Sequence, residues 1–331
     1  MGVSLSIAIG LFSLASVSVV VAAIFLTTAA DIIASRMGLG RLWVGSLLLA
    51  GATSLPELAT ATAAALAGSA DLAAGNMFGA NMLNMSNLAI LLALFGGRQI
   101  FQQVASQQAL VAATAFALTA LAALFAISKA DVTLLEVAIP GVVIVGTYVV
   151  LSGVLRRFSI GIEEESHEEE PSHSLRWAWV VFASCASAIF VAGPLLAITA
   201  DRIAELTGIG ASFIGVLALA LVTTLPELTT TFTAFRIGAP DMAIANMYGT
   251  NSFNIAALGV ASLFYPGGSL FADVGSSSIS AGLFAVLLMG LGMLQLLRRR
   301  PLTNFSFTTP TPPMFVGLYI LGLFIVFRLA S

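Results

Sequence analysis

The chain has 331 residues, of which 59% are hydrophobic and only 9% are charged, and its formal net charge is −3. Soluble domains carry roughly 25% charged residues, so this composition excludes an ordinary soluble domain. It predicts an integral membrane protein that lies in the lipid bilayer and has no nucleic-acid partner. The apolar runs continue over about 20 residues without alternation, which favours helices over the strands of a barrel. The predicted fold class is therefore an all-α polytopic membrane protein.

Ten apolar runs, taken in chain order, predict ten transmembrane helices. They lie near 4–30, 42–67, 72–97, 108–128, 132–155, 176–200, 211–235, 242–265, 279–297 and 313–330. No Lys or Arg precedes the first run, so we interpret it as a true span and not as a cleavable signal peptide. Residues 128–131 are expected to join the fourth and fifth spans in a tight hairpin. The single Cys185 excludes an intramolecular disulfide.

Basic residues predict the orientation in the membrane. If the N-terminus is outside, ten of the thirteen Lys and Arg residues fall in inner loops, and only Lys129, Arg202 and Arg328 fall on the outer side. By the positive-inside rule we expect both termini to be outside. The short linker and the lack of regulatory domains fit a prokaryotic plasma membrane, and no obligate protein partner is evident.

Two of the predicted spans contain a single glutamate in an otherwise apolar stretch. Glu57 follows Thr53-Ser54-Leu55-Pro56, and Glu227 follows Thr223-Thr224-Leu225-Pro226 in the second half of the chain. A carboxylate in the middle of a span is costly, and it indicates a site for ions or protons. The same costly feature in the same local sequence, found twice, strengthens this interpretation.

The two halves of the chain align when Glu57 is set opposite Glu227. In this alignment, residues 53–84 and 223–254 share 15 identities in 32 positions. Each half has five predicted spans, an odd number, so the second half is expected to be inverted in the membrane relative to the first. Inverted repeats with interrupted helices are typical of secondary transporters with a midplane site. We predict a first repeat over 1–155 (motif 51–84) and a second over 176–331 (motif 221–254).

The linker between the halves, residues 156–175, contains the acidic run Glu163–Glu170. We interpret it as a solvated, flexible cytoplasmic connector. The alternative is a weak regulatory cation site that includes His167 and His173.

Each repeat contains two groups of oxygen donors. Pro56 and Pro226 remove a backbone donor and are expected to free carbonyl groups around Ala50 and Ala220. Further along each repeat, asparagines three residues apart share a helix face, and Gly79 and Gly249 are expected to permit close helix approach. The candidate ion-binding residues are Ala50, Thr53, Ser54, Glu57, Asn81, Asn84, Ala220, Thr223, Thr224, Glu227, Thr250, Asn251 and Asn254.

All of these donors are oxygens, which suit a hard cation such as Ca²⁺ with its roughly 6–8 oxygen ligands. Two glutamates balance one divalent ion, but they could instead carry two protons. No separate cofactor is expected. A single Ser, Thr or Asn in a span usually bonds within its own helix, but the repetition of the whole group argues against that reading.

The two motifs resemble the alpha repeats of the calcium:cation antiporter superfamily, which includes the sodium/calcium exchangers. The family pattern is G-T-S-L-P-E followed by G-S-N-I-F-N or a close variant. The resemblance implies a central cluster of spans 2, 3, 7 and 8, with spans 1 and 6 moving to alternate access. It implies that Glu57 and Glu227 are the main Ca²⁺ ligands, with backbone oxygens from Thr53 and Thr223. The resemblance places Ser54, Thr224, Thr250, Asn84 and Asn254 along the path, the flanking monovalent sites or the centre.

Two departures from the family pattern bear on the counter-ion. Sodium-coupled members usually have Ser at the position of Ala80, and many have Asp at one of the positions of Asn84 and Asn254. The site therefore has only two carboxylates and one hydroxyl fewer, which weakens monovalent coordination. The Leu-Pro-Glu form is nevertheless that of the sodium-type branch.

The leading hypothesis is an antiporter that exchanges Ca²⁺ for Na⁺, with exchange for H⁺, or of another divalent cation, as the alternative. A cation channel lined by the same oxygens is the alternative from a different class, but inverted repeats around one site favour a carrier. An intramembrane enzyme is a third reading, and no nucleophile or cofactor motif supports it.

Overall fold

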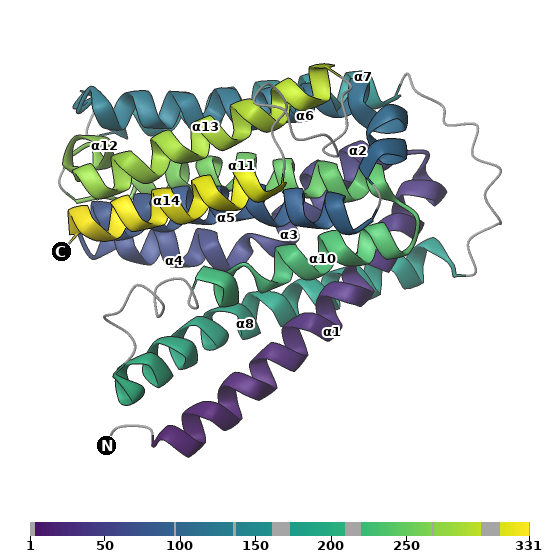
Figure 1. Ribbon diagram of the computed structural model, residues 1–331, viewed down its shortest axis with the longest axis horizontal. Coiled ribbons are helices and arrows are strands. Elements are labelled where there is room, and N and C mark those ends of the chain that lie inside the picture. Colours follow the sequence, from purple (N-terminus) through teal and green to yellow (C-terminus); the bar gives the residue numbers. More distant parts are fainter. Residues whose placement is uncertain are drawn as a thin grey trace.

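The computed structural model describes residues 4–95, 97–134, 137–160, 173–208, 220–266, 268–298 and 312–330. It is helical apart from one two-stranded ribbon, and long helices lie roughly alongside one another (Figure 1). The elements are α1 Leu5–Met37, α2 Arg41–Trp43, the π-helix η1 Val44–Leu49, α3 Ala50–Thr53, α4 Leu55–Leu66, α5 Ala70–Leu94, α6 Gly97–Ile127, β1 Thr133–Leu134, β2 Val137–Ala138, α7 Ile139–Ile160, α8 Leu175–Thr207, α10 Leu225–Arg236, α11 Pro240–Ser262, α12 Leu270–Asp273, α13 Ser276–Arg298 and α14 Pro312–Ala330.

Seven of the described helices are long and apolar enough to cross a membrane. The count becomes eight if the bent pair formed by residues 41–53 and 55–66 is one span. α11 has 23 residues, which is long enough, but it is less apolar because it contains buried asparagines. The chain is therefore an integral membrane protein. Part of the predicted seventh span and most of the acidic linker lie outside the described residues, as does His167.

α1 and α8, the first and sixth predicted spans, pack side by side below the other helices in Figure 1. Each has 33 residues, and each ends at a glycine in the left-handed conformation, Gly38 with φ 62° and Gly208 with φ 75°. Left-handed glycine is a common helix end because it lacks a Cβ. These two glycines occupy equivalent positions in the alignment of the halves, so the two helices are built and terminated in the same way.

Helices from the two halves also meet at equivalent positions of the alignment. The Thr119 hydroxyl of α6 lies 3.4 Å from the Met289 sulfur of α13, its counterpart. Two further contacts correspond to each other in the same alignment: Gln108 Nε2 donates to the Asp241 carbonyl (2.9 Å), and Ser278 Oγ donates to the Asp71 carbonyl (3.2 Å). The same contact between the halves is thus made twice, once in each direction.

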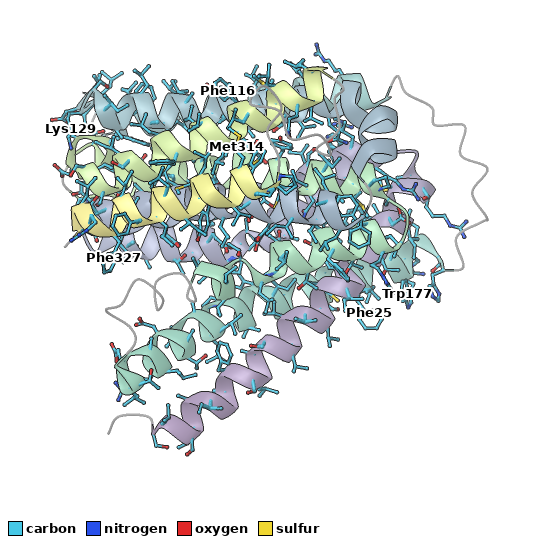
Figure 2. The ribbon with its side chains drawn as sticks, in the orientation of Figure 1. Phe25, Phe116, Lys129, Trp177, Met314 and Phe327 are labelled. Atoms are coloured by element: carbon cyan, nitrogen blue, oxygen red, sulfur yellow. The ribbon has the colours of Figure 1, made fainter. Side chains whose placement is uncertain are left out.

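The connection between α6 and α7 differs from the tight hairpin predicted for residues 128–131. The chain forms a short antiparallel ribbon, in which Thr133 pairs with Ala138 and Leu134 with Val137, and α7 begins only at Ile139. The prediction was wrong because Pro140 favours a helix start at this point and the residues before it pair as strands. Lys129, in this connection, and Phe327 lie at one end of the molecule, and Trp177 lies at the other (Figure 2).

Gly249 of α11 lies directly against the backbone of η1. A Cβ at Gly249 would come within 2.3 Å of the Ser46 carbonyl oxygen, so only glycine fits. The close helix approach predicted for this position is confirmed. At the aligned Gly79 the same prediction was wrong, because a Cβ there would meet nothing within 4 Å among the described residues.

These two glycines provide a matched pair of substitutions. We expect Gly249→Ala to destabilise the folded protein by about 1–3 kcal/mol or more, because backbone would have to shift. Gly79→Ala should leave stability nearly unchanged. Thermal unfolding in detergent, followed by size-exclusion chromatography, measures both, and equal losses would contradict the packing described here.

Candidate cation site

Two helix breaks position the acidic side chains. Ser54 separates α3 from α4 with φ −94° and ψ 9°, and Thr224 precedes α10 with φ −91° and ψ 12°. The helix axis bends by 50° at the first break. Pro56 and Pro226 lie in the first turn of the helix that follows, where proline is tolerated because its missing N–H has no partner there. The interruption predicted from the prolines is thus present in both halves, with the same backbone conformation.

Glu57 and Glu227 are deeply buried in the first turns of α4 and α10. Their exposed fractions are 8% and 1%, and neither forms a salt bridge within the described chain. The helix N-termini favour negative charge at these positions. The two carboxylates are close enough for the charge of one to act on the other, and the Thr53 side chain lies beside Glu227. Two buried negative charges without a basic partner require a cation or protons.

Four buried asparagines join the two halves through α5 and α11. Asn84 Nδ2 donates to Asn251 Oδ1 and Asn254 Nδ2 donates to Asn81 Oδ1, both at 3.0 Å. Asn81 Nδ2 also donates to the Asn251 carbonyl at 3.1 Å. Because Asn84 and Asn254 each commit their amide N–H to the opposite half, their Oδ1 atoms are left unpartnered. These reciprocal hydrogen bonds between the halves therefore fix the orientation of two potential ligand oxygens.

Several buried oxygens of the candidate residues have no hydrogen-bond partner within the described chain. They are Ser54 Oγ, Glu57 Oε2, Asn84 Oδ1, Glu227 Oε1 and Oε2, Thr250 Oγ1 and Asn254 Oδ1. Buried polar groups in folded proteins are nearly always paired. This set of seven oxygens is of the size that Ca²⁺ binds, roughly 6–8.

The hydroxyls of the candidate residues Thr53, Thr223 and Thr224 bond locally, to carbonyls three or four residues earlier in the chain. The Thr53 hydroxyl donates to the Leu49 and Ala50 carbonyls, at 3.2 and 3.1 Å. The hydroxyls of Thr223 and Thr224 both donate to the Ala220 carbonyl, at 3.0 and 3.2 Å. The Ala50 and Ala220 carbonyls also accept backbone N–H groups, so these two carbonyls are engaged, contrary to the expectation that they are free. A carbonyl with a second lone pair can still face a cation.

A further asparagine ties the helix of Glu227 to the rest of the site. Asn246 of α11 donates to the hydroxyls of Thr230 and Thr231, both at 3.0 Å. These hydroxyls lie one turn after Glu227 on α10. The sequence analysis did not select Asn246, because this role depends on the packing of α10 against α11.

A cavity of about 470 Å³ leads from the site towards the end of the molecule that contains Lys129. Its lining includes Ala80, Ala220 and Thr223, and also Asp71 and Ser278. Asp71 Oδ1 accepts hydrogen bonds from the Gly275 N–H and the Ser278 hydroxyl, both at 2.7 Å. Sequence reasoning did not select Asp71, although it is one of the identities of the repeat alignment, aligned with Asp241.

The donor set fits a hard cation better than a transition metal. Within the described residues there is no cluster of three or more His, Cys, Asp and Glu side chains that could hold a metal ion. The site combines two carboxylates with amide, hydroxyl and carbonyl oxygens, which are the ligands preferred by Ca²⁺ and other hard cations.

Comparison with known proteins decides the family. The sequence profile described as sodium/calcium exchanger protein matches residues 7–155 and 177–330, nearly the whole chain in two stretches. This chain belongs to the sodium/calcium exchanger family. The family consists of membrane transporters and is not a class of enzymes, and the resemblance found in the two motifs is thereby confirmed.

Several relatives are similar to this exchanger-family chain. Inner membrane protein YrbG of Escherichia coli (strain K12) is 27% identical over 306 residues, which cover 91% of this chain and 89% of YrbG. Putative antiporter CaxA of Alkalimonas amylolytica is 27% identical over 279 residues, covering 81% of this chain and 85% of CaxA. The fold matches a solved structure of the sodium-calcium exchanger NCX_Mj with a TM-score of 0.68 at 19% identity, over 97% of this chain and 99% of NCX_Mj. At that identity, the likeness shows the fold alone.

Proposed function

We propose that this exchanger-family chain is a secondary antiporter that moves Ca²⁺ in exchange for Na⁺ by alternating access. The observation that supports this most directly is the pair of buried carboxylates, Glu57 and Glu227, at matching helix breaks among unpartnered oxygens. Two negative charges balance one divalent cation, and the same oxygens can take monovalent ions in its place. The two glutamates and the backbone oxygens of Thr53 and Thr223 are the proposed Ca²⁺ ligands. The proposed surrounding and monovalent ligands are Ala50, Ser54, Asn81, Asn84, Ala220, Thr224, Thr250, Asn251 and Asn254.

Ten membrane spans in two inverted repeats, over 1–155 and 176–331, are part of this proposal. The contacts between equivalent positions of the two halves support it, because such contacts are expected on a two-fold axis that relates the halves. The family match in two stretches also supports it. Inverted repeats around a midplane site are the arrangement that alternating access uses.

We place the chain in the plasma (inner) membrane with both termini outside. The distribution of ten basic residues against three supports the orientation, and the name of the Escherichia coli relative supports the membrane.

Proton coupling is the alternative within the same class. Ala80 lines the same cavity as Thr223 and supplies no hydroxyl, and Asn84 and Asn254 supply neutral amides. The two glutamates are then the only titratable groups of the proposed site, and two protons could replace one Ca²⁺.

Radioactive Ca²⁺ uptake into proteoliposomes tests the proposal. Vesicles that contain the purified protein are given either a sodium gradient or a pH gradient. Uptake driven by sodium alone supports sodium coupling, and uptake driven only by pH shows that the glutamates exchange protons. Ca²⁺ flux that persists with no counter-ion on the opposite side would indicate a channel and overturn the antiporter proposal.

Ala80→Ser provides a test of the weak monovalent coordination. The added hydroxyl is in the cavity that Thr223 also lines, and we expect it to strengthen competition by Na⁺. The Na⁺ concentration that half-inhibits Ca²⁺ uptake should fall by several-fold, the effect of about one added ligand with the strength of a hydrogen bond. Unchanged sodium inhibition would show that the missing hydroxyl does not limit sodium binding.

A further inference from the structure

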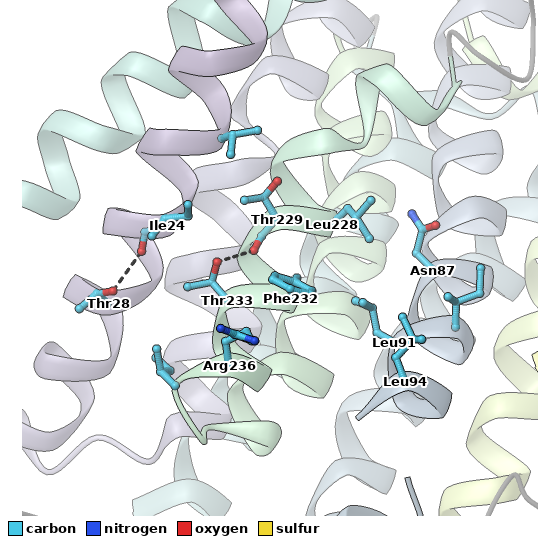
Figure 3. Close-up of a pocket in the computed structure, with 13 residues that line it drawn as sticks. Ile24, Thr28, Asn87, Leu91, Leu94, Leu228, Thr229, Phe232, Thr233 and Arg236 are labelled. Carbon is cyan, nitrogen blue, oxygen red and sulfur yellow. Dashed lines mark hydrogen bonds between the residues drawn. The ribbon is translucent and has the colours of Figure 1, made fainter. Parts of the chain in front are cut away.

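A second cavity, of about 780 Å³, lies between α1, α5 and α10 (Figure 3). Its walls are mostly apolar, and several of its side chains are largely exposed: Ile24 (42%), Ile90 (41%), Leu94 (71%), Phe232 (42%) and Ile237 (39%). Exposed side chains of this kind on membrane-spanning helices face hydrocarbon. The cavity is therefore open to the bilayer, and its volume lies in the range of ligand sites, about 300–1,000 Å³.

Two polar groups face this cavity without a partner. Arg236, at the end of α10, is exposed and makes no hydrogen bond or ion pair with described residues. Asn87 of α5 is only 5% exposed, and its Nδ2 has no partner in the described chain. Arg236 lies eight residues beyond Leu228, which is about 12 Å along a helix. The cavity thus has a guanidinium at one end, an amide donor in its wall and hydrocarbon surface between them.

The cavity is poorly suited to conduct cations. None of the described residues that line it is a carboxylate, and Arg236 repels positive charge. The hydroxyls of Thr28 and Thr233 point back to their own helices, donating to the Ile24 and Thr229 carbonyls at 3.1 and 2.7 Å, as Figure 3 shows. The ions of the proposed transport cycle therefore have little to bind there.

Asn87 and Arg236 have no equivalent in the other half of the chain. In the alignment of the two halves, Asn87 is opposite Ala257 and Arg236 is opposite Leu66. An asparagine and an arginine that occur in only one half are not required by the repeated fold. They indicate that this face of the protein has a property in addition to those of the repeated fold.

We propose that this cavity is a binding site for an anionic phospholipid. One acyl chain lies in the apolar cavity between α1 and the α5–α10 pair, and the headgroup phosphate binds the guanidinium of Arg236. Guanidinium groups suit phosphate because they can donate two parallel hydrogen bonds. Arg236 lies on the predicted inner side, where anionic lipids are attracted by basic residues. The acyl chain ends short of Asn87, because methylene groups cannot satisfy its amide donor.

Native mass spectrometry of the full chain tests this site without measuring transport. The protein is reconstituted in nanodiscs of phosphatidylcholine and phosphatidylglycerol, released, and analysed for retained lipid. We expect retention of phosphatidylglycerol over phosphatidylcholine by the unaltered chain. Arg236→Gln should lower this preference by about five-fold, the effect of one basic residue beside an anionic lipid. Ile90→Trp, which narrows the cavity, should lower retention of both lipids.

Matched controls separate the site from general effects on the protein. Arg157→Gln removes an exposed arginine on the same predicted side, and Leu124→Trp adds the same bulk to α6, where Leu124 is 58% exposed. Both variants should keep the lipid preference, and size-exclusion chromatography shows that every variant is folded. Unchanged retention in Arg236→Gln and Ile90→Trp, or equal losses in the controls, would overturn the proposal. Because the experiment measures bound lipid, a failure of the lipid-site proposal is independent of whether the chain exchanges Ca²⁺.

Discussion

Replacing either Glu57 or Glu227 by Gln is expected to abolish Ca²⁺ transport, with a loss of about 100-fold or more. The substitution keeps the shape of the side chain and removes one of the two buried negative charges. Losing one member of a buried charge interaction costs about 2–5 kcal/mol, and a tenfold change in affinity is about 1.4 kcal/mol. Because no basic side chain pairs with either glutamate in the described chain, the bound cation is the partner that loses its ligand.

Radioactive Ca²⁺ uptake into proteoliposomes measures this effect, and Glu205→Gln is the matched control. Glu205 is an exposed acid that pairs with Arg202 at 2.8 Å near the end of α8, a helix that contains neither break. It should retain normal uptake, since exposed ion pairs contribute about 0–1 kcal/mol. Normal turnover in Glu57→Gln or in Glu227→Gln would refute the site.

Replacing Asn251 by Ala is expected to weaken Ca²⁺ binding by about tenfold while the protein stays folded. The change removes the oxygen that accepts the Asn84 N–H at 3.0 Å. The Asn84 amide then loses its fixed orientation, and a buried donor left unpaired costs about 1–3 kcal/mol. The ligand affected thus belongs to the first half of the chain, although the substitution is in the second.

The corresponding change Asn81→Ala should act in the same way on Asn254. A double-mutant cycle between Asn84 and Asn251, measured as half-saturating Ca²⁺ for uptake, should show a coupling energy of about 0.5–3 kcal/mol. Asn76→Ala, on the same helix as Asn81 and only partly buried, is the control. If the substitutions at Asn84 and Asn251 change half-saturating Ca²⁺ independently, the hydrogen bonds between the asparagines do not orient the ligands.

The long helices and the position of the proposed site could be predicted from local sequence. Continuous apolar runs indicate spans, and Pro56 and Pro226 identify the helix breaks because proline changes the backbone wherever it occurs. The glutamate in each half could also be identified locally, because it is a single charge in an otherwise apolar stretch. These are features that a residue produces within its own segment.

What could not be predicted depends on contacts between distant segments. The spacing of Asn81 and Asn84 placed them on one helix face, but only the packing of α5 against α11 shows that their amides exchange hydrogen bonds with the other half. The ribbon before α7 and the different surroundings of Gly79 and Gly249 likewise depend on neighbours that are remote in sequence. Asn87 and Arg236 were unremarkable in the sequence because the cavity that they share is formed by three separate helices.

The exchange of hydrogen bonds among the asparagines also restricts how the protein can evolve. If the two halves arose by duplication of one ancestral segment, each copy now supplies the acceptor for an amide of the other copy. A change from amide to carboxylate at Asn254 would remove the N–H that donates to Asn81 Oδ1. It therefore requires a compensating substitution in the opposite copy. The halves are therefore inherited as a matched pair, and a chimaera with one half from a relative inherits a mismatch at its centre.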